Sequence, residues 1–164
     1  MAERGPALAA GAALLLLLPA GARPRLVWNA TPSAPVGLYA VTAPAKLRAG
    51  DLVIVRPPPA AARLAAERHY LPLGVPLVKR IAALPGDPVC ASGPTLRGPR
   101  GVMVRRLARD AQGRLLPWWN GCGRLGPTAY LLLMADVPDS FDGRYFGPVA
   151  RARIVGMACP LWLL

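Results

Sequence analysis

Glycine and proline recur along the chain and limit the length of any regular element that it can form. Its 164 residues include 17 glycines and 20 prolines. Proline cannot continue a β ladder or a helix interior, and glycine weakens both. Beyond an apolar N-terminal segment, the sequence therefore predicts a mostly β domain of short strands, with enough residues for one sizeable core.

Six segments are predicted to be strands, and one alanine-rich segment, Ala60–Arg68, is predicted to form helical turns. The region 92–121 is rich in glycine, proline and arginine, and we interpret it as an inserted hairpin. The predicted strands are Val36–Val41, Asp51–Arg56, Leu77–Ala83, Gly101–Leu107, Tyr130–Ala135 and Arg153–Ala158.

Lys79 lies in the predicted strand Leu77–Ala83, on the same side as two apolar side chains. Alternation along a strand places Leu77, Lys79 and Ile81 on one face. If that face packs inward, burial lowers the pKa of the Lys79 amine, because desolvation disfavours the ammonium form. A neutral lysine can act as a general base. The alternative is that the amine extends to solvent, as lysines in strands usually do.

Ser33 is the candidate nucleophile, because its turn-rich segment should hold the hydroxyl outward. Pro32 precedes it and Pro35 follows it. A serine needs a base, and the only histidine, His69, lies in an arginine- and glutamate-rich segment with no clear acidic partner in the sequence. Lys79 is therefore the most economical base, although a serine between prolines is also typical of an ordinary turn.

Four motifs follow one another along the chain and together resemble one enzyme family. They are Asn29-x-Thr31-x-Ser33-x-Pro35-x-Gly37-x-Tyr39, Arg48-Ala49-Gly50-Asp51-Leu52-Val53, Val78-Lys79-Arg80-x-x-x-Leu84-Pro85-Gly86-Asp87 and Asp139-Ser140-x-Asp142-x-Arg144-Tyr145-Phe146-Gly147-Pro148. This set resembles the bacterial type I signal peptidase family, in particular its conjugative-transfer branch, the TraF-type peptidases.

The resemblance implies a signal-peptidase/LexA-like β fold and a serine endopeptidase that uses a Ser-Lys dyad without a metal or organic cofactor. Ser33 would be the nucleophile, and Lys79 would be the base that takes its proton. The Thr31 hydroxyl would join the backbone N–H of Ser33 in the oxyanion hole.

The same resemblance assigns supporting roles to the fourth motif. Ser140 would orient the lysine, and Asp142 with Arg144 would support the site. Gly143 departs from the Asp-Ser-Arg that signal peptidases often carry, so one supporting hydroxyl is absent. Asp142 and Arg144 could instead form only a surface ion pair.

Residues 1–23 are predicted to be a membrane anchor or signal segment, and residues 24–164 the catalytic domain. The run from Pro6 to Ala22 has no charged residue and only just reaches the length of a membrane-spanning helix. Ala20-Gly21-Ala22 also resembles a signal cleavage site. We favour an uncleaved anchor, because it would hold Ser33 near the bilayer. The resemblance implies a bacterial inner-membrane protein whose catalytic domain faces the periplasm.

The net charge of +12 comes from 20 Lys and Arg against 8 Asp and Glu. The basic residues could simply cover a solvated surface. They could also attract the domain to membrane lipid, at about 1 kcal/mol per basic residue near anionic headgroups. Nucleic-acid binding is not expected, because the basic residues are scattered and are not interleaved with aromatic residues.

Three cysteines in an exported chain allow one disulfide and one free thiol. A bridge between Cys90 and Cys122 would close a loop of about 33 residues and stabilise the fold by roughly 3 to 4 kcal/mol. The alternative is that these are unpaired small apolar residues. Asn120-Gly121 predicts a hairpin turn beside Cys122. No Cys/His spacing indicates a metal site.

The resemblance also implies the substrate, which would be the signal or propeptide region of an exported protein bound as an extended strand. For the conjugative branch this would be a pilin precursor of a type IV secretion apparatus. One alternative is a catalytically inactive, membrane-anchored assembly factor of the same fold. Another is a self-cleaving protein of the LexA-repressor kind, which predicts a DNA-binding domain where this chain has its apolar segment.

Overall fold

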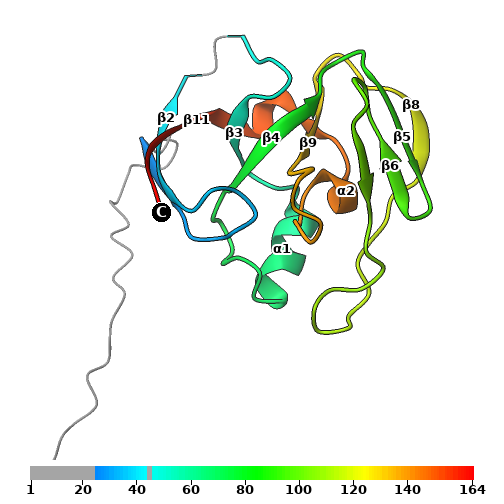
Figure 1. The fold of residues 1–164 in the computed structure, drawn as a ribbon, viewed down its shortest axis with the longest axis horizontal. Helices are drawn as coiled ribbons and strands as arrows, with labels where there is room; N and C mark the ends of the chain where they lie inside the picture. The colour runs from blue at the N-terminus through cyan, green and yellow to red at the C-terminus, as the bar shows by residue number, and fades with distance from the viewer. Residues whose placement is uncertain (1–24, 44–45) are drawn as a thin grey trace, which may run out of the picture.

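The computed structural model describes residues 25–43 and 46–164, and within them the chain forms two antiparallel β-sheets (Figure 1). The larger sheet contains, in spatial order, β1 (Leu26–Asn29), β2 (Gly37–Thr42), β11 (Ile154–Leu163), β3 (Leu52–Val55), β4 (Leu77–Ala83), β9 (Ala129–Leu133) and β10 (Val149–Ala150). The smaller sheet contains β7 (Met103–Arg105), β6 (Thr95–Arg97), β5 (Pro88–Ser92) and β8 (Gly121–Arg124). The prediction of a mostly β fold is confirmed.

Strand β11 lies between β2 and β3, although it follows every other strand along the chain. Ala158 is paired with Val41 of β2, and Met157 is paired with Val53 of β3. The strand continues along β2 as far as Leu163, beyond the predicted end at Ala158. The β1–β2 hairpin is thus joined to β3 and β4 through β11.

The predicted elements agree with the structure where local pattern is strong. Strand β4 has the predicted bounds, Leu77–Ala83, and each of the other five predicted strands overlaps an observed one. The alanine-rich segment forms helix α1 (Pro59–Glu67), which begins with a proline, a residue well suited to a first helical position. The short helix α2 (Gly143–Phe146) was not predicted. The region 92–121 contains β6, β7 and the long connection to β8.

The hairpin turn predicted at Asn120-Gly121 is wrong. Gly121 is the first residue of β8, which pairs with the distant strand β5 and not with the segment just before it. The Asn120 side chain accepts a hydrogen bond from Arg106 (3.1 Å), and the Trp119 carbonyl accepts another from the same guanidinium. These contacts with residues far along the chain determine the backbone path here, so the local turn preference does not.

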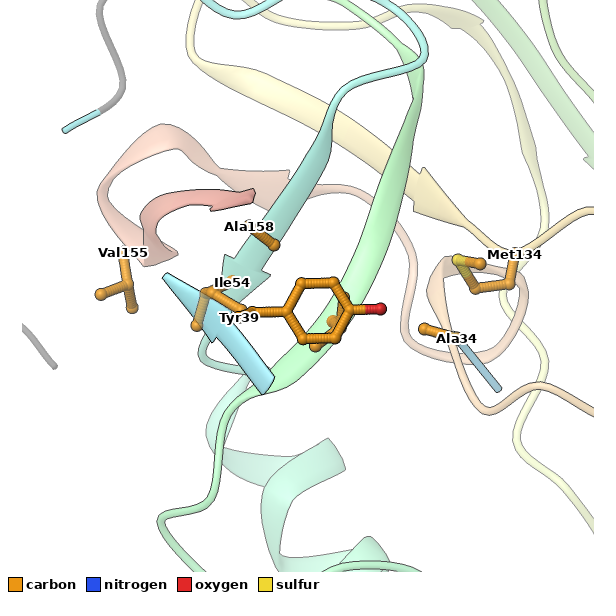
Figure 2. Packing of buried hydrophobic residues seen from close by; sticks show 7 residues of the cluster. Ala34, Tyr39, Ile54, Met134, Val155 and Ala158 are labelled. Carbon is orange, nitrogen blue, oxygen red and sulfur yellow. The ribbon is translucent and has the colours of Figure 1, made fainter. Parts of the chain in front are cut away.

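The core of the larger sheet has a layer on each of its faces. On one face, the Tyr39 ring packs against apolar side chains, with its hydroxyl directed to the side on which Ala34 lies (Figure 2). That hydroxyl donates to the Pro35 carbonyl at 2.6 Å, in the turn that carries Ser33. The buried members of this cluster are Ala34, Tyr39, Ile54, Val78, Met134, Val155 and Ala158.

The opposite face of the larger sheet is packed as well, so its central strands are buried on both sides. Val53 and Val55 point away from Ile54, as strand alternation requires, and all three are wholly buried. Leu77 packs against this second layer. Its buried members are Val53, Val55, Ile81, Leu132, Val149 and Ile154.

The smaller sheet packs against the end of the larger one through a shared apolar cluster. Cys90 of β5 and Cys122 of β8 are partners in register and are joined by a disulfide, whereas Cys159 has a free thiol. The disulfide thus joins the neighbouring strands β5 and β8 of the smaller sheet covalently. The shared cluster consists of Ala83, Leu131 and Leu133 with Val89, Ala91, Leu96 and Val104.

The predicted anchor at residues 1–23 lies outside the described residues. Across residues 25–43 and 46–164, no helix has both the length and the hydropathy of a membrane span.

Candidate active site

Three polar side chains from separate parts of the chain meet at strand β4 of the larger sheet. Ser33 comes from the turn between β1 and β2, Lys79 from the middle of β4, and Ser140 from the loop before α2. The Lys79 Nζ atom donates to Ser33 Oγ at 3.0 Å and to Ser140 Oγ at 2.9 Å. The amine is therefore directed at the candidate nucleophile from one side and restrained by a second hydroxyl from the other.

Burial changes the acid-base properties of Lys79. Its side chain is 1% exposed, so the alternative that the amine extends to solvent is wrong. Desolvation lowers the pKa of Lys79 to about 8; the negative charge of Asp142 opposes this decrease, and the positive charge of Arg144 adds to it. At pH 7 about a tenth of such amines are neutral, far more than for a lysine in water. Lys79 can thus serve as a base near physiological pH.

Asn29 organises the turn that presents Ser33, a function that the sequence did not reveal. Its side-chain amide donates to the carbonyls of Thr31, Ala34 and Pro35 at 2.9 to 3.0 Å. Three carbonyls gathered on one buried amide fix the backbone of the turn on both sides of the serine. The available signal was the position of Asn29 at the start of the first motif, but its spacing alone indicates no role.

The Thr31 hydroxyl lies beside the nucleophile but is engaged elsewhere. Its Oγ1 is 3.2 Å from Ser33 Oγ and donates to Asn29 Oδ1 at 3.0 Å. A hydroxyl has one proton, so Thr31 can only accept from Ser33 in this arrangement. For Thr31 to stabilise an oxyanion, its O–H must rotate away from Asn29.

Asp142 and Arg144 form a fully buried ion pair below Ser140. Their side chains are 0% and 1% exposed, so the alternative of a surface pair is wrong. Asp142 accepts from the backbone N–H of Met134 at 2.9 Å, and Arg144 donates to the carbonyls of Met134 and Pro138 at 2.8 and 2.7 Å. The pair therefore fixes both ends of the loop that carries Ser140.

Gly143 has a steric reason to be glycine. A Cβ atom added there would lie 2.6 Å from the carbonyl oxygen of Leu132, which belongs to the adjacent strand β9. The carbonyl of Gly143 accepts from the Trp119 indole N–H at 2.9 Å. The close approach of α2 to β9 thus leaves no space for the serine that this position often has in signal peptidases.

A cavity of about 350 Å³ opens beside the two catalytic candidates. Its walls are mainly apolar, which suits a polypeptide side chain. The segment after α1 and the β7–β8 connection both contribute to it, and sequence reasoning identified neither. The lining residues outside the catalytic candidates include Ala65, Tyr70, Leu71, Leu77, Leu107, Asp110, Leu116 and Phe141.

Neither a metal site nor a histidine base is seen at the cavity within the described residues. In the part of the chain that the structure describes, no three histidine, cysteine or acidic residues come together as metal ligands would. His69 is exposed and is not among the residues that line the cavity.

Comparison with known proteins agrees with these features. The family model for signal peptidase, peptidase S26, matches residues 5–162. A plasmid transfer protein TraF of Escherichia coli is 37% identical over 165 residues, covering 94% of this chain and 92% of the relative. A probable conjugal transfer protein TraF of Sinorhizobium fredii is 37% identical over 139 residues, covering 79% of this chain and 73% of the relative.

Among solved structures, a signal peptidase I from Enterococcus faecalis aligns with 69% of this chain and 97% of its own, at 20% identity and a TM-score of 0.39. The resemblance to signal peptidases and to the TraF proteins of conjugation, expected from the four motifs, is confirmed by the family model and the sequence relatives. The chain belongs to the signal peptidase family, peptidase S26.

Proposed function

We propose that the protein is a serine endopeptidase that removes signal or propeptide segments from exported proteins by a Ser-Lys dyad. One observation carries the proposal: the Lys79 amine is buried and lies 3.0 Å from the Ser33 hydroxyl oxygen, with Ser140 on its other side. A serine and a base within hydrogen-bond distance, with the base oriented by a third group, is the arrangement that activates a nucleophile.

The reaction begins when Lys79 is neutral. Ser33 Oγ attacks the scissile carbonyl carbon while its proton passes to Lys79 Nζ. The tetrahedral intermediate then expels the leaving amine, which takes that proton from the lysine ammonium. Water next attacks the acyl-serine ester, again giving a proton to Lys79, and the ammonium returns a proton to Ser33 Oγ as the ester breaks. Protons balance over the two half-reactions.

The negatively charged oxygen of the tetrahedral intermediate needs hydrogen-bond donors to stabilise it. The backbone N–H of Ser33 and the Thr31 hydroxyl are the proposed pair, and one such donor is worth about 3 to 4 kcal/mol of transition-state stabilisation. The hydroxyl lies 3.2 Å from Ser33 Oγ, which supports this role, but it must first release Asn29. We infer that substrate binding reorients Thr31.

The substrate is proposed to be a pilin precursor of a conjugative or type IV secretion system. The support is the similarity to plasmid and conjugal transfer proteins named TraF. The largely apolar cavity beside Ser33 suits an extended polypeptide with a side chain directed inward.

The membrane is the proposed location, with residues 1–23 as an anchor in the bacterial inner membrane and the catalytic domain in the periplasm. An exposed apolar patch supports this proposal, because it lies where the described chain begins. There, the rings of Trp28 and Trp162 are 6.0 Å apart. Large apolar surface of this kind is typical of contact with lipid or protein. The exposed residues of the patch are Leu26, Trp28, Leu161, Trp162, Leu163 and Leu164.

Cleavage of a co-expressed pilin precursor in membranes tests the proposal. Ser33→Ala and Lys79→Ala should each abolish processing at normal protein abundance. Ser92→Ala and Lys46→Ala are matched controls, since both residues are exposed, and both variants should process normally. Processing that survives Ser33→Ala or Lys79→Ala would exclude the dyad, and a wild-type protein that cuts no precursor would favour the inactive assembly factor.

A further inference from the structure

Two segments that are far apart in the sequence meet at the edge of the cavity. Tyr70 follows α1, and Asp110 belongs to the connection between β7 and β8. The Tyr70 hydroxyl donates to Asp110 Oδ2. The guanidinium of Arg68 lies 3.6 Å from the same oxygen. We name Arg68, Tyr70, Asp110 and Arg114 the Asp110 clasp.

Arg114 reinforces the contact from the Asp110 side. Its Nε donates to Asp110 Oδ2 at 2.7 Å, and its guanidinium lies over the Tyr70 ring, 5.6 Å from the centroid. Arg68 in turn donates to the Leu115 carbonyl at 2.8 Å. The two segments are therefore joined by two arginines, one carboxylate and one ring.

Asp110 remains charged in this arrangement. Burial alone would raise its pKa, but hydrogen bonds from Tyr70 and from the backbone and side chain of Arg114 outweigh that effect and hold the pKa well below its usual range. The carboxylate also accepts from the backbone N–H of Gln112 at 3.0 Å, which shapes the loop tip. The clasp is thus an ion-paired contact throughout the physiological pH range.

The clasp forms part of the same cavity as the dyad. Tyr70 and Asp110 line it together with Ser33 and Lys79. Leu107 and Leu116, which flank the loop tip, also line the cavity. The backbone N–H of Leu107 donates to the Tyr145 hydroxyl at 3.1 Å, so one end of the loop is fixed to α2. The Asp110 clasp fixes the tip of the loop and its Leu116 end.

We propose that the Asp110 clasp determines substrate specificity: by holding the 107–116 loop against Tyr70, it fixes the size of the cavity beside Ser33 and so the size of the substrate side chain that the cavity accepts next to the cut. This inference rests on the proposed peptidase function. None of the four clasp residues lies within hydrogen-bond contact of Ser33 or Lys79, so they act through the shape of the wall and are positioning residues. Enzymes that discriminate by size do so through such walls, where one added methylene group changes the rate about tenfold or more.

The test measures kcat/KM for two forms of one precursor, with alanine or phenylalanine immediately before the cut. Wild type should prefer alanine. Asp110→Ala should reduce this preference about tenfold, mainly through a lower KM for the phenylalanine form. Tyr70→Phe, which keeps the ring and removes one hydrogen bond, should reduce it about threefold, and Asp110→Asn should lie between the two.

Asp87→Asn is the matched control. Asp87 accepts a backbone N–H, that of Leu84, and pairs with an arginine, Arg100, as Asp110 does, but it does not line the cavity. It should leave the preference unchanged. If thermal unfolding shows that Asp110→Ala does not fold, the substrate preference of Tyr70→Phe tests the clasp proposal in its place.

The outcomes separate the two proposals. A preference that stays at the wild-type value in Tyr70→Phe and in folded Asp110 variants overturns the clasp proposal alone. A preference that falls as much in Asp87→Asn overturns it too, because the effect would not depend on the cavity wall. Failure of wild type to cut either precursor overturns the proposed peptidase function and this inference with it.

Discussion

Two aspartate–arginine contacts use the same chemistry in different surroundings, one beside the loop of Ser140 and one at the cavity that Asp110 lines. Asp142 and Arg144 are 0% and 1% exposed, whereas Asp110 and Arg114 are 8% and 36% exposed. Each aspartate accepts a backbone N–H as well as its arginine. The Asp142–Arg144 pair fixes the loop that carries Ser140, and the less buried Asp110–Arg114 pair joins two segments that are far apart in the sequence. A charge left without its partner costs more when it is fully buried than when it can reach solvent, so the first contact should contribute more to stability than the second.

The largest difference should appear when each carboxylate is removed. Asp142→Ala leaves the Arg144 guanidinium buried and unpaired, and should lower the free energy of unfolding by about 3 to 5 kcal/mol. Asp110→Ala should cost much less, because Arg68 and Arg114 can turn to solvent. Urea denaturation of both variants measures the difference. Equal losses would show that burial does not distinguish the two contacts.

The lowered pKa of Lys79 should make the stability of the fold depend on pH. Its folded pKa of about 8 lies below the unfolded value near 10.5, so the folded state releases its proton first as pH rises. Stability should therefore increase between about pH 8 and pH 10.5, by about 3 kcal/mol in all, and the penalty should be fully present below pH 8. Lys79→Met should remove this increase in urea titrations at several pH values.

Activity should follow the same titration, rising with pH through about 8. The negative charge of Asp142 raises the pKa of Lys79, so folded Asp142→Asn should shift the rise to lower pH. Asp110→Asn should leave it in place. A shift in both variants would show that Asp110 also influences the pKa of Lys79, contrary to this prediction.

Gly143→Ala tests the packing next to the buried pair. The added Cβ would lie 2.6 Å from the backbone oxygen of Leu132, and overpacking of this kind costs about 1 to 3 kcal/mol. Gly123→Ala is the matched control, since a Cβ there meets nothing within 4 Å. Calorimetry should show a lower melting temperature for the first variant only.

Added salt should change the substrate preference less than any substitution does, and it should do so by weakening the ion pairs of the Asp110 clasp. Raising sodium chloride from about 0.1 to about 1 M shortens the screening length from about 10 to about 3 Å. The alanine-over-phenylalanine preference of the wild type should fall about twofold, while Asp110→Ala should show no such change. An equal fall in Asp110→Ala would mean that salt acts elsewhere.

Much of the main sheet could be predicted from the sequence, because its signals are local. The alternation of Leu77, Lys79 and Ile81 predicted the bounds of β4 and left both a buried and a solvent-exposed amine open, and the structure shows the buried one. The family resemblance of the fourth motif implied that Asp142 and Arg144 act together. Which residues form a pair, and how deeply they are buried, still depended on the family resemblance and then on the structure.

The remaining features depend on contacts between distant segments. Tyr70 and Asp110 are 40 residues apart, and no pattern around either indicates the other. Asn120-Gly121 has a strong turn preference, yet pairing of β8 with β5 overrides it. Asn29 is similar, since its role is visible only when the carbonyls that it binds are placed in space. Sequence periodicity contains no information about such pairings.

The place of β11 between β2 and β3 also has a consequence for biosynthesis. Ser33 precedes β2 and Lys79 lies on β4, and in the order of the larger sheet β11 lies between the β1–β2 hairpin and the β3–β4 pair. A ribosome-arrested chain that stops before Ile154 should therefore fail to process a precursor, whereas one that includes Leu163 outside the ribosome should succeed. Under the proposed function, proteolytic competence would then arise only after β11 is made.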